Sequence, residues 1–186
     1  MRRALDLVYA AALIVAALAL VTIAVLVLVQ IGGRILDRVL LSTGGAAIGF
    51  QVPSLSEIGG FLFVAAAFLA LPATLKNAGH VRVTMLAAAL PPAPARVLTI
   101  IVLAAALGLA IFATWHSGVQ VQDSWAFNSV SFGMVRVPLW IPQGMMTLGL
   151  GLFALALADE LVLALTGRTP AFAANEAARS IDEGGH

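Results

Sequence analysis

The sequence predicts an all-α integral membrane protein, built as a bundle of four transmembrane helices. Of its 186 residues, 61% are hydrophobic and 10% are charged, with a mean hydropathy of +1.04, whereas a soluble domain carries about 25% charged residues. A helix rises about 1.5 Å per residue, so about 20 residues cross a hydrocarbon core about 30 Å thick. Four charge-free apolar runs meet or approach that length, at residues 7–29, 58–75, 97–115 and 137–158.

Each run should be a helix, because a backbone inside lipid must satisfy its own hydrogen bonds. We expect helices near residues 5–31, 57–77, 95–117 and 137–165, in one domain of residues 1–166. A polar cytoplasmic tail, residues 167–186, follows. The first run also resembles a secretory signal peptide, since it comes after Met1-Arg2-Arg3. A signal has an apolar core of only about 7–15 residues, so we expect a retained helix.

The basic residues predict an orientation with both ends in the cytoplasm (N-in, C-in), because cytoplasmic segments carry an excess of Lys and Arg. This topology gives the inner face Arg2, Arg3, Lys76, Arg82, Arg96, Arg168 and Arg179, and leaves Arg34, Arg38 and Arg136 outside. It also puts all three tryptophans, Trp115, Trp125 and Trp140, near the outer interface, where indole rings are favoured.

Two connections have a half-apolar composition that predicts short interfacial helical segments. One is residues 35–41 in the first outer loop, and the other is residues 80–90 in the inner loop, which Pro91-Pro92-Ala93-Pro94 ends before the third helix.

Several classes of function are disfavoured by what the sequence lacks. A net charge of +1 argues against nucleic-acid binding. The inner parts of the four runs offer only weak polar groups such as Thr22, Thr99 and Thr147, whereas transport pathways are normally marked by ionisable residues or broken helices. The three histidines are not paired at one depth, and cysteine is absent. We therefore expect no catalytic, metal-binding or cofactor-binding residues, and no enzyme activity.

The candidate functional residues lie at the ends of the helices. Arg34 follows the first run and Glu57 precedes the second, so the two side chains could pair at the outer interface or face lipid headgroups separately. Lys76, His80 and Arg82 form a basic cluster at the inner end of the second run. Asp159-Glu160 is interpreted as a solvated helix end, with contact to a partner as the alternative. Small residues four apart, such as Ala12 and Ala16 or Ala66 and Ala70, are typical of close helix packing in lipid.

The order of these features resembles the small, DctQ-type membrane subunit of tripartite ATP-independent periplasmic (TRAP) transporters. The resemblance extends from about Leu5 to Leu165. It is carried by Arg34 and Glu57, by Leu-Pro-Ala-Thr-Leu-Lys-Asn-Ala-Gly-His-Val-Arg-Val at residues 71–83, which includes Lys76, His80 and Arg82, and by Val-Pro-Leu-Trp-Ile-Pro-Gln at residues 137–143, which includes Trp140 and Gln143. The loop between Arg34 and Glu57 is longer and richer in glycine than the family pattern.

The resemblance implies sodium-driven uptake of small organic acids across a bacterial inner membrane. A periplasmic binding protein would capture the substrate, and a large membrane subunit would carry substrate and sodium ions. This chain would be the scaffold of that large subunit, would help dock the binding protein, and would hold no cofactor itself. Besides these two proteins, its expected partners are membrane lipids. The alternative is the membrane anchor of a redox or other multi-subunit complex.

Overall fold

A computed structural model describes residues 2–77 and 91–167. Within them lie four helices, α1 (Arg2–Ser42), α2 (Leu55–Lys76), α4 (Pro92–Ala126) and α5 (Trp140–Leu165). All four are long and apolar enough to span a membrane, which confirms the predicted all-α, four-span fold. His80, Arg82, the predicted inner interfacial segment and tail residues 168–186 lie outside the described residues.

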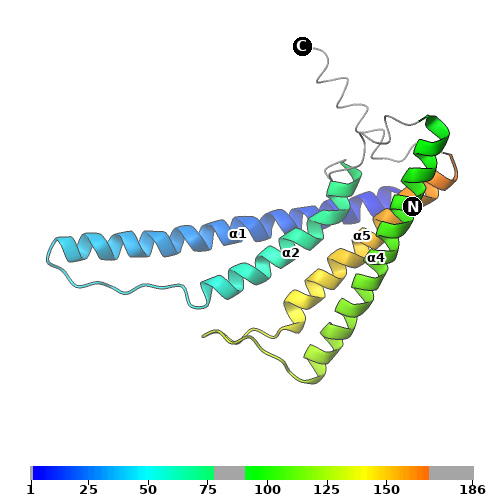
Figure 1. The fold of residues 1–186 in the computed structure, drawn as a ribbon. Coiled ribbons are helices and arrows are strands. Elements are labelled where there is room, and N and C mark those ends of the chain that lie inside the picture. The colour runs from blue at the N-terminus through cyan, green and yellow to red at the C-terminus, as the bar shows by residue number, and fades with distance from the viewer. Residues whose placement is uncertain (1, 78–90, 168–186) are drawn as a thin grey trace, which may run out of the picture.

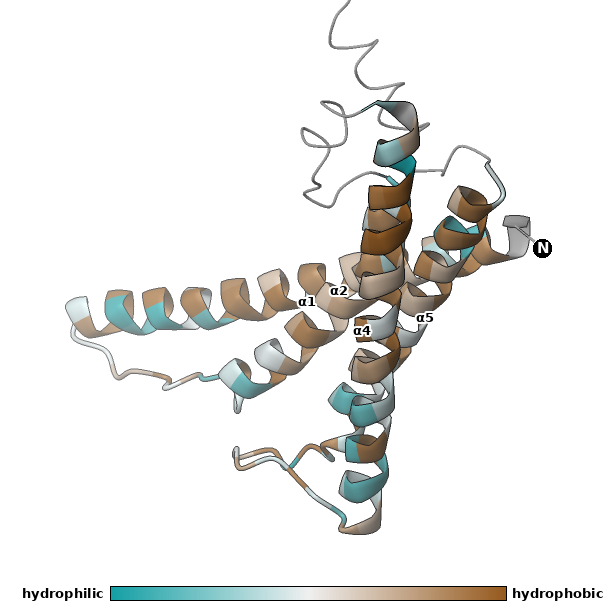
Figure 2. Ribbon diagram, turned by 45° about the vertical axis from the view of Figure 1, so that its right-hand side comes forward, coloured by the Kyte–Doolittle hydropathy of each residue, from teal (hydrophilic) through white to brown (hydrophobic). Residues whose placement is uncertain are grey.

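The helices form an open layer in the order α1, α2, α5, α4 (Figure 1). In the most apolar window of each span, 33% of the residues are buried in α2 and in α5, but only 17% in α1 and 11% in α4. The central helices therefore have neighbours on both sides, and the two outer ones have a neighbour on one side. We call the end at which α1 begins and α2 ends the predicted inner end. There the helices converge, and they spread apart toward the predicted outer end (Figures 1 and 2).

Alanines form the contact between α1 and α2. Ala12, Ala16 and Ala19 of α1 are buried against Ala65, Ala66 and Leu69 of α2, with Ala70 beside them. Small side chains let two backbones approach closely, and packing rather than hydrophobicity drives helix association in lipid. The predicted Ala12/Ala16 and Ala66/Ala70 pairs both belong to this contact.

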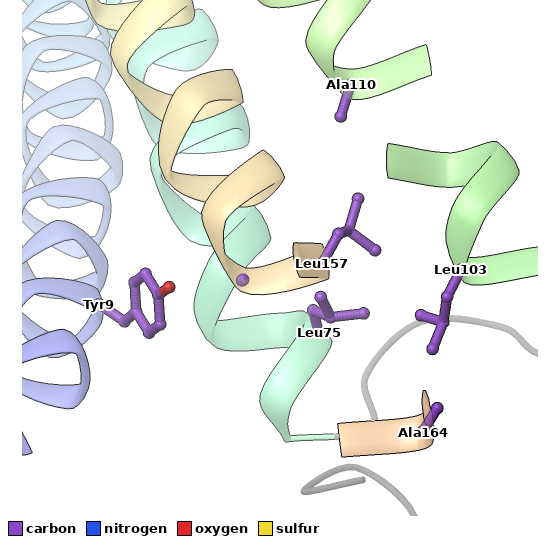
Figure 3. Close-up of a cluster of buried hydrophobic side chains, with 7 residues drawn as sticks. Tyr9, Leu75, Leu103, Ala110, Leu157 and Ala164 are labelled. Carbon is purple, nitrogen blue, oxygen red and sulfur yellow. The ribbon is translucent and has the colours of Figure 1, made fainter. Parts of the chain in front are cut away.

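A second buried cluster joins all four helices nearer the predicted inner end (Figure 3). It consists of Tyr9, Leu75, Leu103, Ala110, Ala156, Leu157 and Ala164. Because α1 and α4 contribute here, the layer is held together at the end where the helices converge.

Pro72 and Gly149 create a close contact between the two central helices. Proline has no amide N–H, so Pro72 removes the helical hydrogen bond to the carbonyl of Phe68, four residues earlier. That carbonyl lies against α5, where a Cβ on Gly149 would be 2.6 Å from both its carbon and its oxygen. Glycine at position 149 therefore lets α5 pass close to the backbone of α2 at Phe68.

Helix α1 is longer than predicted. It continues to Ser42 instead of ending near residue 31, so the predicted interfacial segment 35–41 is part of one helix of 41 residues, about 60 Å long. Helix α1 continues through Gly32 and Gly33, and the loop that follows it returns along its side. Phe50 occupies the space beside Gly33, where a Cβ would be 2.8 Å from the Phe50 ring. Helix α4 likewise continues to Ala126, past the predicted end at residue 117.

Candidate interaction sites at the two ends of the helices

Glu57 joins the start of α2 to the connection between α4 and α5. Its Oε1 accepts a hydrogen bond from the amide of Gly133 at 3.2 Å. A Cβ on Gly133 would overlap Glu57 Oε2, so a larger residue here would force the Glu57 carboxylate to move. Arg34 and Glu57 form neither a hydrogen bond nor an ion pair with each other within the described part of the chain. Of the two arrangements left open by the sequence, the structure therefore has separate side chains.

The connection that Glu57 holds is a narrow hairpin, which the sequence did not reveal. Val130 and Pro138 form an antiparallel bridge, and the buried Ser131 hydroxyl accepts a hydrogen bond from the amide of Val137 at 3.0 Å. Ser54, just before α2, accepts a second hydrogen bond from the hairpin tip, from the amide of Val135 at 2.9 Å. The start of α2 thus fixes the hairpin by two side chains.

Arg34 lies on the part of α1 that extends past the predicted span, and its side chain is exposed. The neighbouring polar residues of α1 bind the returning loop. Gln30 Oε1 accepts a hydrogen bond from the amide of Val52 at 2.6 Å, and Asp37 accepts from the amides of Ile48 at 2.7 Å and Gly49 at 3.1 Å. Asp37 is engaged with these backbone amides, and within the described residues no hydrogen bond or ion pair holds the Arg34 guanidinium.

Trp140 and Gln143 begin α5 at the predicted outer end. The Trp140 ring makes an edge-to-face contact with Trp125, with the ring centroids 4.9 Å apart. This contact ties the first turn of α5 to the last turn of α4. Gln143 has a buried side-chain oxygen that no donor from the described residues reaches.

Lys76 connects α2 to the beginning of α1 at the predicted inner end. Its Nζ lies 2.5 Å from an Asp6 carboxylate oxygen and 4.8 Å from the centre of the Tyr9 ring. The Lys76 side chain is 17% exposed and that of Asp6 is 56% exposed. The residue predicted to belong to a basic cluster is thus engaged within the chain, by an ion pair and a cation–π contact.

Glu160 was expected at a solvated helix end, and this prediction is wrong. Its side chain has 0% exposure, because it lies on α5 between Leu157 and Ala164, where the other helices pack against α5.

Arg96, which the sequence identified only as an inner positive charge, connects α4 to α5. From the first turn of α4 it donates hydrogen bonds to two carbonyls in the last turn of α5, from Nε to Ala164 at 3.1 Å and from Nη2 to Leu165 at 2.9 Å. A guanidinium at this position complements the negative end of the α5 dipole. The signal in the sequence was an arginine in a first helical turn, where its own helix dipole disfavours it.

The polar contacts described above all lie within this chain. Among residues 2–77 and 91–167, no three His, Asp or Glu side chains come together as metal ligands would. The polar groups described above instead bind backbone amides, backbone carbonyls or each other.

Comparison with known proteins assigns the chain to a family. Residues 39–167, more than half of the chain, match the family described as tripartite ATP-independent periplasmic transporters, DctQ component. A comparison with curated proteins found no match. The family is a membrane component of these transporters, consistent with the four spans. It is associated with a large membrane subunit and a binding protein. The chain therefore belongs to the DctQ family, as the small, multi-pass inner-membrane subunit of a TRAP transporter.

Proposed function

We propose that this chain is the scaffold of the large subunit in a sodium-driven importer of small organic acids. The large subunit carries the substrate and binds the sodium ions, and the periplasmic binding protein delivers the substrate. The small subunit holds the large one in the membrane and helps dock the binding protein at its outer end. Membership of the DctQ family supports this reading over the alternative of a redox-complex anchor.

The observation that carries the proposal is the combination of uncharged spans with an open arrangement. No charged residue interrupts any of the four apolar runs, and a pathway for ions or organic acids needs such groups. An open layer leaves broad apolar surfaces on α1 and α4 (Figure 2). Such a layer suits a chain that is covered by another membrane protein.

At the outer end, Glu57 and Arg34 have different surroundings. Glu57 is used inside the chain, where it holds the hairpin through Gly133. Arg34 is exposed on the extension of α1. In the proposed N-in, C-in orientation Arg34 faces the periplasm, so it is the candidate of the two for contact with the binding protein.

The test is transport in proteoliposomes containing the small and large subunits, with the cognate binding protein outside. A thermal-shift screen of the binding protein against a panel of monocarboxylic and dicarboxylic acids first supplies the substrate. We expect uptake that requires the small subunit and stops when the sodium gradient is collapsed. Uptake by the large subunit without the small one would contradict the scaffold role.

The Arg34→Ala variant tests the docking role, with Arg38→Ala as the matched control on the same exposed extension. We expect Arg34→Ala to raise the binding-protein concentration needed for half-maximal uptake, with the substrate preference and the amount of assembled complex unchanged. A changed substrate preference would contradict the proposal, because selectivity is assigned to the other two proteins.

A further inference from the structure

A groove runs along one face of the layer, between α4 and α5. Its volume is about 550 Å³, and it is lined by one stripe of residues from each helix. On α4 the stripe extends from Leu107 to Gln122, a length of about 22 Å along the helix axis. None of the described residues that line the groove is charged. The hydroxyl of Thr114 already donates a hydrogen bond to the carbonyl of Ala110 at 2.7 Å. Its donor therefore needs no acceptor from an occupant of the groove.

The floor of this groove contains glycines that the chain does not need for its own packing. A Cβ on Gly118 would meet only Thr147 Cγ2 at 3.9 Å, and a Cβ on Gly151 would meet only Thr114 Cγ2 at 3.8 Å, both ordinary contacts. Gly149, two residues from Gly151, shows the opposite case, because a Cβ there would collide with the backbone of α2. Glycine weakens a helix relative to alanine. The two groove glycines, like Gly108 outside the groove, therefore carry a cost that contacts inside this chain do not explain, and within the groove they leave space for a neighbour.

We propose that a transmembrane helix of the large subunit lies in this groove, in contact with Gly118, Gly151, Ala154 and Ala158. The occupant belongs in the membrane, because the groove is uncharged and lies within two spans. A helix fits its length, since about 22 Å accommodates a row of side chains spaced three and four residues apart. Small residues on both walls permit the close backbone approach by which helices associate in lipid. The family supplies a membrane partner.

The proposal rests on the proposed scaffold function and adds the surface through which the partner is held. It predicts that the contacting stripe of the large subunit is apolar and uncharged. The competing occupants are a lipid chain and a second copy of this protein. The experiment below distinguishes both of them from a helix of the large subunit.

The test uses the full complex in membranes, with the photo-reactive residue p-benzoylphenylalanine at single positions of this chain. Leu155 lines the groove and is 55% exposed, whereas Leu109 does not line it and is 70% exposed. We expect illumination to join position 155 to the large subunit and position 109 mainly to lipid. An adduct of position 155 with lipid alone, or with a second copy of the small subunit, would overturn the proposal.

A second variant fills the groove directly. Gly151→Leu introduces a side chain where the partner helix should approach, and we expect about a tenfold loss of affinity for the large subunit, equivalent to about 1.4 kcal/mol. Gly108→Leu is the control, since a Cβ there meets nothing within 4 Å and the residue does not line the groove. Equal recovery of the large subunit with both variants would overturn the proposal. If the wild-type chain did not recover the large subunit at all, the scaffold function itself would fail.

Discussion

Replacing Gly149 with alanine should separate the two central helices. The added Cβ would lie 2.6 Å from the carbonyl carbon and oxygen of Phe68 and 2.8 Å from its Cβ. Carbon atoms pack best at about 3.5–4.0 Å, so α2 and α5 must move apart by about 1 Å at this point. Overpacking of this kind costs about 1–3 kcal/mol. We therefore expect Gly149→Ala to lower the free energy of unfolding by about that amount.

The measurement is equilibrium unfolding in mixed micelles, with SDS as the denaturant and the tryptophan fluorescence as the signal. Gly151→Ala is the matched control, because its Cβ meets only Thr114 at 3.8 Å and alanine favours the helix by up to about 1 kcal/mol. The double variant with Phe68→Ala should not recover stability, since the collision is with the backbone. Equal unfolding midpoints for Gly149→Ala and Gly151→Ala would refute the reasoning.

Three further changes test the contacts at the two ends. Glu57→Ala should speed amide hydrogen exchange in the hairpin of residues 128–139, while Glu57→Gln, which retains an acceptor, should change it less; equal exchange in both would count against the Gly133 contact. Arg96→Gln should speed exchange in the last turn of α5, because two carbonyls lose a charged donor, and an unaltered exchange rate there would show that solvent replaces it. Asp6→Asn should lower the free energy of unfolding by less than about 1 kcal/mol, since the Asp6 side chain is 56% exposed; a larger loss in SDS titration would indicate a stronger role for its pair with Lys76.

The membrane fold was predictable because it depends on composition along the chain. An apolar run of about 20 residues is recognisable in isolation, and all four predicted runs are found in helices that can span a membrane. The order of the helices was not predictable in this way. In lipid an apolar face is acceptable against a neighbour or against the bilayer, so the alanine spacing indicated close packing without saying which helices meet. The role of Gly149 depends on the carbonyl that Pro72 frees on another helix, and only the fold brings these residues together.

The helix ends were harder to predict, because their contacts join residues far apart in the sequence. Glu57 and Gly133 are 76 positions apart, so the sequence suggested only Arg34 or the lipid headgroups as partners of Glu57. The end of α1 was placed too early because Gly32 and Gly33 are typical of a loop. The helix nevertheless continues to Ser42, with Phe50 of the returning loop beside Gly33. Glu160 was assigned to solvent because it is charged and follows the apolar run, yet the neighbouring helices bury it.

These contacts divide the polar residues of the chain into two groups with different consequences. Glu57, Ser54, Asp37 and Arg96 bind backbone groups of the same chain, so their loss should disturb this subunit before it disturbs any partner. Arg34 has no such role in the described structure, and its loss should leave the subunit intact. A substitution that lowers transport is therefore informative about a partner only when the stability of the isolated subunit is unchanged. Two sites meet that criterion, Arg34 and the uncharged groove between α4 and α5. Substitutions there should change the binding of a partner protein without lowering the stability of this subunit.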